Sequence, residues 1–114
     1  MNYKVPYDFV LAQLYPLRPR IIRMLGGYGL HLEKRLVMFL REKEAEPEFN
    51  GVFVATQPEY FKALQDEIHL TRMEFDLDGG KDSWIFISED LYDFEEKVRK
   101  ACEMIKQGDL RIGK

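Results

Sequence analysis

The chain has 114 residues, of which 46% are hydrophobic and 32% are charged. This length and balance are typical of one globular domain, residues 1–114, and exclude a wholly disordered chain. The formal net charge of −3 argues against binding nucleic acid or an anionic membrane through bulk charge. No stretch approaches the ~20 apolar residues of a membrane-spanning helix. The single cysteine, Cys102, excludes an internal disulfide and favours a cytoplasmic location.

The first half of the chain is predicted to hold one helix and four strands. Apolar spacing over residues 7–15 predicts a helix that ends before Pro16. Short apolar or alternating runs predict strands over 21–25, 30–32, 35–41 and 51–55. Glu33 and Lys34 form a predicted two-residue turn, and the glutamate-rich segment 42–48 is expected to be a solvated loop.

A second helix is predicted to start near Thr56. Thr56 and Glu59 match the capping-box pattern, and Pro58 stands in the first turn, where its missing N–H costs nothing. Tyr60, Phe61 and Leu64 supply the apolar face of this helix.

The remaining segments predict a hairpin and a long helix. Residues 71–77 alternate apolar and charged side chains, and the run 84–87 returns as the hairpin partner. An apolar stripe predicts a helix over 89–107, with Ser88 as N-cap and Gly108 as the stop. The element order, roughly α-β-β-β-(β)-α-β-β-α, predicts an α+β fold. We expect an antiparallel sheet of five to six strands with helices packed on one face.

Residues 26–29 place three glycines around Tyr28. This density is not expected inside a regular strand or helix, whereas glycine allows positive φ and close backbone approach. We therefore predict a structural bend formed by Gly26, Gly27 and Gly29, with Tyr28 displayed at the surface. A phosphate-binding loop is disfavoured, because the nucleotide-loop spacing and a following Lys-Ser/Thr pair are missing.

Residues 23–30, Arg-Met-Leu-Gly-Gly-Tyr-Gly-Leu, together with 9–14, 37–39 and Tyr60-Phe61, resemble the N-terminal domain of TfoX, a bacterial competence regulator. The resemblance covers the whole chain by element order and about half of it by motif. It implies a fold similar to secretion-chaperone-like and YjbR-like α+β domains, and a regulatory role. The Glu33-Lys34 turn departs from the family, which usually has an acidic residue and a glycine in that hairpin. The second, helical domain of the full-length regulator is not within these residues.

Arg18, Arg20 and Arg23 form a basic cluster near the predicted bend. Three arginines would neutralise only a few phosphates, so nucleic-acid binding through them would be weak and salt-sensitive. A nucleic-acid-associated regulator that uses this cluster with Tyr28 is therefore an alternative to a protein-interaction module.

Large apolar side chains point to both faces of the predicted sheet. Neighbouring residues within 36–40 and 84–87 must point in opposite directions, and Trp84 is the largest of them. An apolar face left exposed usually marks an interface, which predicts a homodimer or a protein partner. A second alternative is a small-molecule pocket between sheet and helices, lined by Trp84, Tyr60 and Phe86.

No set of acid, base and nucleophile is evident, so we predict a non-catalytic protein without cofactor or metal. His31 and His69 belong to different elements and have no third ligand type spaced near them. Cys102 lies on the apolar stripe of the last helix, which predicts a buried and inert thiol.

Overall fold

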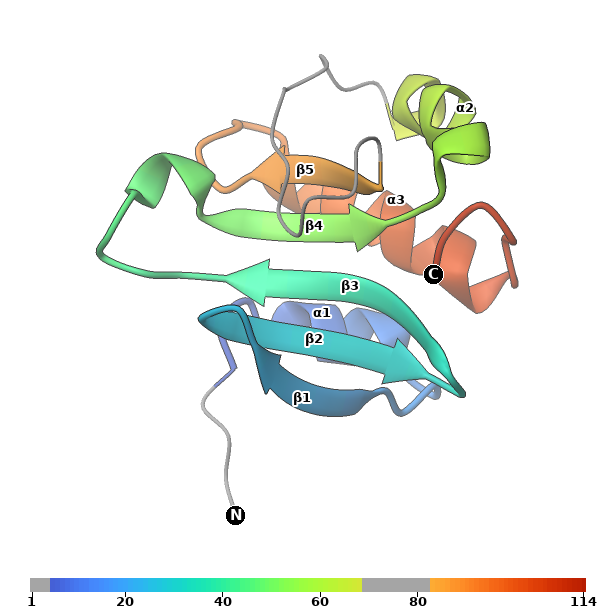
Figure 1. Cartoon of the computed structure of the whole chain (residues 1–114), viewed down its shortest axis with the longest axis horizontal. Coiled ribbons are helices and arrows are strands. Elements are labelled where there is room, and N and C mark those ends of the chain that lie inside the picture. The colour runs from blue at the N-terminus through green and yellow to red at the C-terminus, as the bar shows by residue number, and fades with distance from the viewer. Residues whose placement is uncertain (1–4, 69–82) are drawn as a thin grey trace.

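The computed structural model describes residues 5–68 and 83–114, and within these ranges it has a five-stranded sheet and three α-helices (Figure 1). Every neighbouring pair of strands is antiparallel, and the order in the sheet is β1-β2-β3-β4-β5. The α+β class and the antiparallel sheet confirm the prediction. The elements are α1 (Phe9–Leu14), β1 (Arg20–Met24), β2 (Gly27–Leu32), β3 (Arg35–Arg41), a short 3₁₀ helix η1 (Pro47–Phe49), β4 (Gly51–Ala55), α2 (Pro58–Ile68), β5 (Trp84–Ser88) and α3 (Phe94–Lys106).

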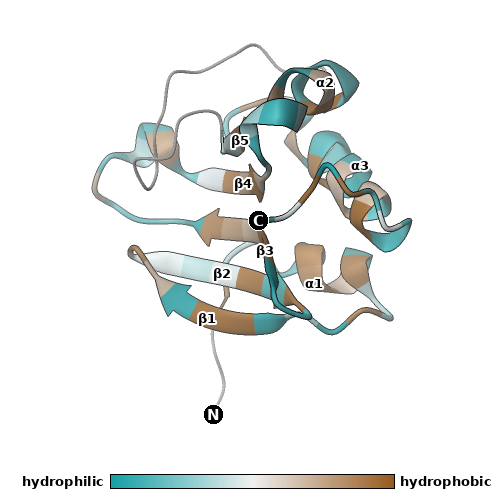
Figure 2. Cartoon of the chain, turned by 45° about the vertical axis from the view of Figure 1, so that its right-hand side comes forward, coloured by the Kyte–Doolittle hydropathy of each residue, from teal (hydrophilic) through white to brown (hydrophobic). Residues whose placement is uncertain are grey.

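Helices α1 and α3 lie side by side on one face of the sheet (Figures 1 and 2). The main core fills the space between them and the sheet, and includes Val10, Val98 and Ile87. A second cluster lies on the opposite face, because side chains alternate along each strand: Ile85 and Ile87 point to the helices, whereas Trp84 and Phe86 point away. The sheet therefore has an apolar layer on both faces.

Helix α2 packs beside β5 and contacts α3. Its apolar side chains, among them Phe61 and Leu64, join the helix-side core. The last residues of the chain are tied to the sheet: the Leu36 N–H donates to the Lys114 carbonyl, and the Lys114 N–H donates to that of Leu36. This segment therefore lies alongside the first half of β3, where β4 does not reach.

The last helix starts later than its apolar stripe predicts. Ser88 is the final residue of β5, and its Oγ accepts a hydrogen bond from the Asp90 N–H instead of capping a helix. Turns follow, and α3 begins only at Phe94. Its end is as predicted: Gly108 has φ +76°, and its N–H donates to the Ile105 carbonyl. The Asp109 N–H donates to the Met104 carbonyl, which completes a Schellman motif.

The predicted capping role of Thr56 is also corrected. Thr56 is buried, its hydroxyl donates to the carbonyl of Arg111 at 2.6 Å, and α2 begins at Pro58. Thr56 therefore holds the C-terminal segment instead of capping α2.

The predicted strand 71–77, the turn that follows it and His69 lie outside the described residues.

Candidate interaction surface at the sheet edge

The glycine-rich segment forms the tight turn between β1 and β2. Leu25 and Gly26 have φ of +49° and +79°, and Met24 pairs with Gly27 across the turn. Two consecutive residues with positive φ are the mark of a type I′ hairpin. The predicted positive φ is thus confirmed at Gly26.

The prediction that all three glycines lie outside regular strand is wrong. Gly27 and Gly29 lie inside β2, and the structure needs glycine there for space. A Cβ on Gly27 would stand 2.4 Å from the Leu40 carbonyl oxygen, and one on Gly29 would stand 2.5 Å from Met24 Sδ. The bend is confined to the hairpin turn, and the other two glycines permit close packing on a neighbouring strand and side chain.

Strand β1 forms one edge of the sheet. In an antiparallel pair, hydrogen-bonded and non-hydrogen-bonded residues alternate, and the pair next to a two-residue turn is hydrogen-bonded. Counting from Met24, the backbone N–H and C=O groups of Arg23 and Ile21 point away from β2. Within residues 5–68 and 83–114, no backbone hydrogen bond covers this outer side. As far as the described residues go, this edge is therefore open to pairing with another strand.

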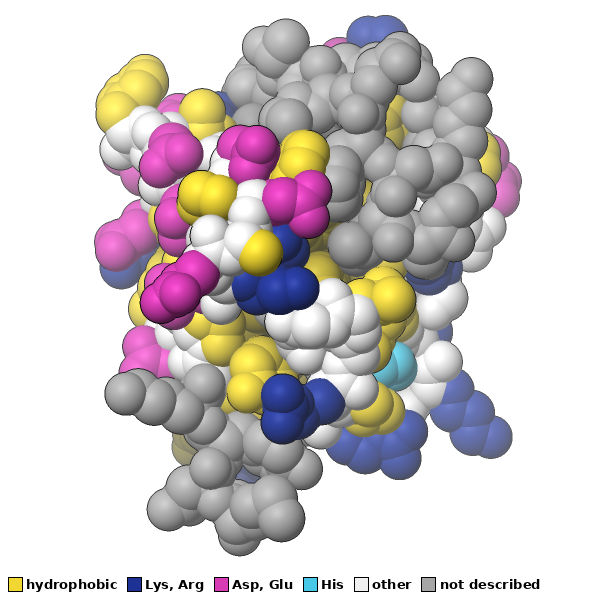
Figure 3. Space-filling model, turned by 60° about the vertical axis from the view of Figure 1, so that its left-hand side comes forward, with side chains coloured by type: hydrophobic (Ala, Val, Ile, Leu, Met, Phe, Trp, Pro, Cys, Tyr) yellow, Lys and Arg dark blue, Asp and Glu magenta, His cyan; other side chains and the backbone are white. Residues whose placement is uncertain are grey.

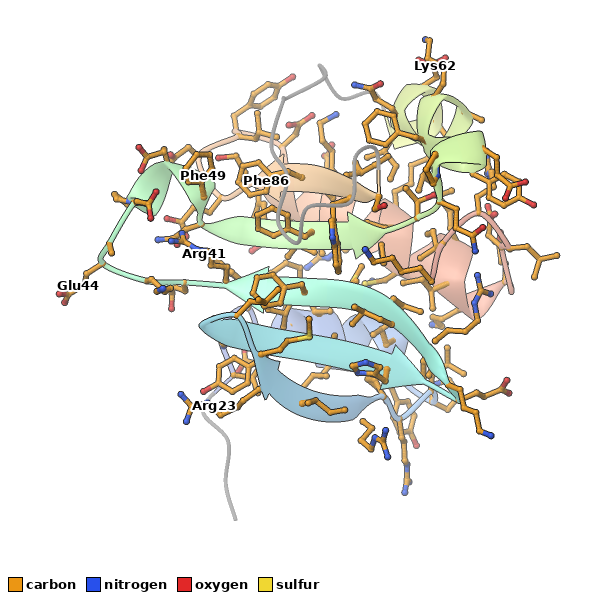
Figure 4. All side chains as sticks on the ribbon, viewed as in Figure 1. Arg23, Arg41, Glu44, Phe49, Lys62 and Phe86 are labelled. Carbon is orange, nitrogen blue, oxygen red and sulfur yellow. The ribbon has the colours of Figure 1, made fainter. Side chains whose placement is uncertain are left out.

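The three predicted arginines line this edge. Arg18, Arg20 and Arg23 are all exposed, and none forms an ion pair with a described carboxylate. The Arg23 guanidinium stands 5.8 Å from the ring centroid of Tyr28, its cross-strand partner (Figure 4). The structure thus brings Tyr28 beside Arg23, as predicted from the sequence. Arg20 projects from the face of β1 opposite to that of Arg23, because positions 20 and 23 are an odd number of residues apart.

Negative charge is concentrated elsewhere on the molecule. Glu42, Glu44, Glu46 and Glu48 are all exposed on the loop between β3 and β4, as expected of a solvated segment. Figure 3 shows acidic side chains gathered at the upper left and basic side chains near the bottom of the same view. The four glutamates of this loop and the arginines at the β1 edge therefore lie on different elements of the fold.

Trp84 does not belong to the arginine surface. It lies on β5, which is at the other end of the described strand order from β1, and is only 5% exposed. Its ring packs edge-on against Phe39 and Phe53, with both centroid separations 6.4 Å, and the Lys114 amine stands 4.5 Å from its centroid. The interaction role predicted for Trp84 is therefore replaced by a packing role.

The expected exposed apolar face is also corrected. Phe39, Phe53 and Phe86 of the second cluster are all buried in the single chain. The apolar residues on both sheet faces therefore supply no argument for a homodimer.

The prediction that Trp84 and Phe86 line a pocket between sheet and helices is wrong. Both side chains belong to the cluster on the face of the sheet away from α1 and α3 (Figure 4).

Two polar arrangements were not predicted from the sequence. Arg41 is 6% exposed, and its guanidinium donates to Asn50 Oδ1 at 2.7 Å and to the carbonyls of Glu46 and Ala45 at 2.9 Å (Figure 4). The Tyr7 hydroxyl donates its single proton to Glu89 Oε1 at 2.5 Å, and the Arg41 carbonyl is a second, more distant acceptor at 3.1 Å. Burial and the bond to Glu89 raise the pKa of Tyr7 well above its usual range. Both arrangements fix loops at one end of the sheet.

The described residues contain no cluster of three His, Cys, Asp or Glu side chains that would hold a metal ion. In the same part of the chain, the helices are too short or too polar to cross a lipid bilayer. Sequence comparisons with family models and curated proteins, and a structural comparison with solved proteins, find no match.

Cys102 is buried on α3, and this burial raises the pKa of its thiol to about 12, from an ordinary value near 9. We expect an aromatic disulfide reagent at pH 8 to label the folded chain at least about a hundredfold more slowly than the denatured chain, because only a thiolate attacks and only opening exposes it. The raised pKa contributes stability below pH 9 that is lost as the pH rises further. Absorbance of the released thiolate measures the rate, and fast labelling of the folded chain would contradict this burial.

Proposed function

We propose that this chain is a non-catalytic protein-interaction module, of the kind found as the N-terminal domain of TfoX, and that it acts in regulation. The observation that carries the proposal is the outer side of β1, where backbone groups of Ile21 and Arg23 point outward without a described partner. The single, buried Cys102 is compatible with a reducing compartment, and we propose a cytoplasmic location.

The partner that fits this edge is an extended acidic segment of another protein. An added strand would satisfy the outward N–H and C=O groups through main-chain hydrogen bonds. Its carboxylates would meet Arg18, Arg20 and Arg23, which have no ion pair with a described carboxylate. Charge and backbone geometry therefore favour the same class of partner.

A second copy of the chain fits the same edge less well. Antiparallel pairing of β1 with β1 about a two-fold axis would bring Arg18, Arg20 and Arg23 of both copies to one seam. This accumulation of like charge makes a second copy a poorer partner than an acidic segment. Duplex DNA remains the alternative ligand for three arginines, and it would use side chains without any need for the backbone edge.

The test is the binding of a fluorescent peptide with the repeat Val-Glu-Glu-Val, which as an extended strand carries glutamates on both faces, measured by anisotropy at low and high salt. We expect saturable binding that weakens with salt, and weaker binding for Arg20→Ala and Arg23→Ala. We expect Arg23→Pro to bind a further ~5-fold more weakly than Arg23→Ala, because proline also removes one outward N–H. Lys62→Ala, which removes an exposed cation from α2, serves as the matched control and should leave binding unchanged.

Each alternative has its own result. Equal affinity of Arg23→Ala and Arg23→Pro would overturn strand pairing, and equal binding of a valine–lysine peptide would overturn acidic recognition. Tighter, salt-dependent binding of a short DNA duplex than of the acidic peptide would replace the proposal with the nucleic-acid alternative. A solution mass of two chains by light scattering, lost on Ile21→Glu, would assign the edge to a second copy. If Arg23→Pro does not fold by circular dichroism, the two alanine variants decide the outcome.

A further inference from the structure

A groove of about 510 Å³ lies at the other end of the β1–β2 hairpin, away from the glycine turn. It is bounded by the turn between β2 and β3, by the end of α3 and by the segment that follows α3. Its apolar lining comes from all three of these places and from the α1–β1 connection: Leu17, Leu32, Val37, Ile105, Leu110 and Ile112. Sites for small molecules fall in this range of volumes and are mostly apolar with a few placed polar groups.

Arg35 is the best-positioned cation in this groove. Its Nη2 donates to the carbonyl oxygens of Leu110 and Gly113, at 3.4 and 3.3 Å, and these bonds hold the half-buried guanidinium at the rim. No described carboxylate forms an ion pair with it, and its other N–H donors have no described partner. Arginine presents a rigid fork of donors that matches a carboxylate.

The other charges at the rim leave the groove positive. Arg18 and Lys106 also line it, and Lys106 has only a long contact of 3.8 Å with Glu103. Of the two lining carboxylates, Asp109 is bound by the Arg111 guanidinium at 2.6 Å, which also holds the pKa of Asp109 below its usual range. The charge of Asp109 is therefore compensated within the chain. That leaves Glu33, on the exposed hairpin turn, against three cations.

We propose that this groove binds a small organic acid, with its apolar body on Leu17, Val37 and Ile112 and its carboxylate on Arg35 and Arg18. The apolar lining excludes a small, highly charged anion as the best ligand, because such an anion would leave that lining in water. The arginines exclude an amphipathic cation. Leu110 is 72% exposed at the rim, where it is available to cover a bound apolar chain. This site shares Arg18 with the arginines of the β1 edge, but it uses none of the outward backbone groups of β1 and does not depend on the function proposed for that edge.

The experiment is a titration of the ¹⁵N-labelled chain with octanoate, followed by amide NMR shifts. We expect saturable shifts at Gly108, Ile112 and Leu32, which line the groove, and much smaller shifts at α2. Octanol and octylamine are the matched probes, with the same chain and a neutral or positive head. We expect both to bind at least about tenfold more weakly than octanoate, because neither accepts a charge-assisted pair of hydrogen bonds from arginine.

Variants separate the contribution of the arginine charge to octanoate binding from any effect on folding. Arg35→Gln should raise the dissociation constant for octanoate about tenfold, whereas Arg35→Lys should retain more of the affinity. Arg18→Gln is an exposed change that tests the same charge without touching the bonds that Arg35 makes, and Lys62→Gln is the control. Unchanged affinity in both arginine variants, equal affinity for octanol, or shifts that map to another surface would each overturn the proposal. If Arg35→Gln does not fold, Arg18→Gln decides it.

Discussion

Replacing Gly27 with alanine is expected to lower the free energy of unfolding by about 3 kcal/mol. A Cβ at this position would stand 2.4 Å from the backbone oxygen of Leu40 and 2.6 Å from the Phe39 ring. The carbonyl belongs to the neighbouring strand and cannot rotate away, so the β2–β3 pair itself would have to separate. Urea unfolding followed by circular dichroism measures the loss.

Gly26→Ala is the matched control for this change. Gly26 has φ +79°, which costs an alanine about 1 kcal/mol, but its nearest neighbour is the flexible end of Lys43. The two variants therefore differ in packing and not in the residue introduced. A loss at Gly26 equal to or greater than the loss at Gly27 would contradict the close strand packing described above.

Asn50→Ala is expected to cost a similar amount, about 3 kcal/mol, because it leaves several polar groups without partners at once. Asn50 Oδ1 accepts from Arg41 Nη1 at 2.7 Å and from the Lys43 N–H at 2.9 Å, and Nδ2 donates to the Lys43 carbonyl at 2.7 Å. The Arg41 guanidinium is buried, so losing one of its acceptors is more expensive than at a surface. Thermal and urea unfolding would report the loss.

Asn50→Asp separates these contributions. Aspartate keeps an acceptor for Arg41 and for the Lys43 N–H but loses the donor to the Lys43 carbonyl, so we expect a loss smaller than that of Asn50→Ala. Glu44→Ala, in the exposed part of the same loop, should be within about 0.5 kcal/mol of the parent chain. An Asn50→Ala variant as stable as Glu44→Ala would show that the network contributes nothing to folding.

The sequence predicts strands well where a short apolar run has clear ends. The runs 35–41 and 51–55 became β3 and β4 with the same bounds, since each is flanked by charged or turn-forming residues. It fails where two local patterns compete. Leu91 has the spacing of the α3 stripe and packs on the core, yet it precedes the helix, because Ser88 belongs to β5 and its side chain forms a turn.

The candidate site was predicted in composition but not in placement. The arginines and Tyr28 are close in sequence, so their proximity at one hairpin follows from the chain itself. That β1 is a sheet edge depends on the whole topology, which no local pattern specifies. The burial of Trp84 depends in the same way on distant residues: its described neighbours include Phe39 and Lys114, far from it in the chain.

The order of strands along the sheet is their order along the chain. During synthesis each strand from β2 onward therefore emerges next to a partner that is already present, and the first three strands need only short turns to pair. The helix-side core, in contrast, can be completed only late in synthesis. Helix α1 is made first, but it gains its contact with α3 only after residues 94–106 have left the ribosome. Until then Val10 and Leu14 cannot pack against α3, so the core over the first half of the sheet is completed by one of the last elements to be made.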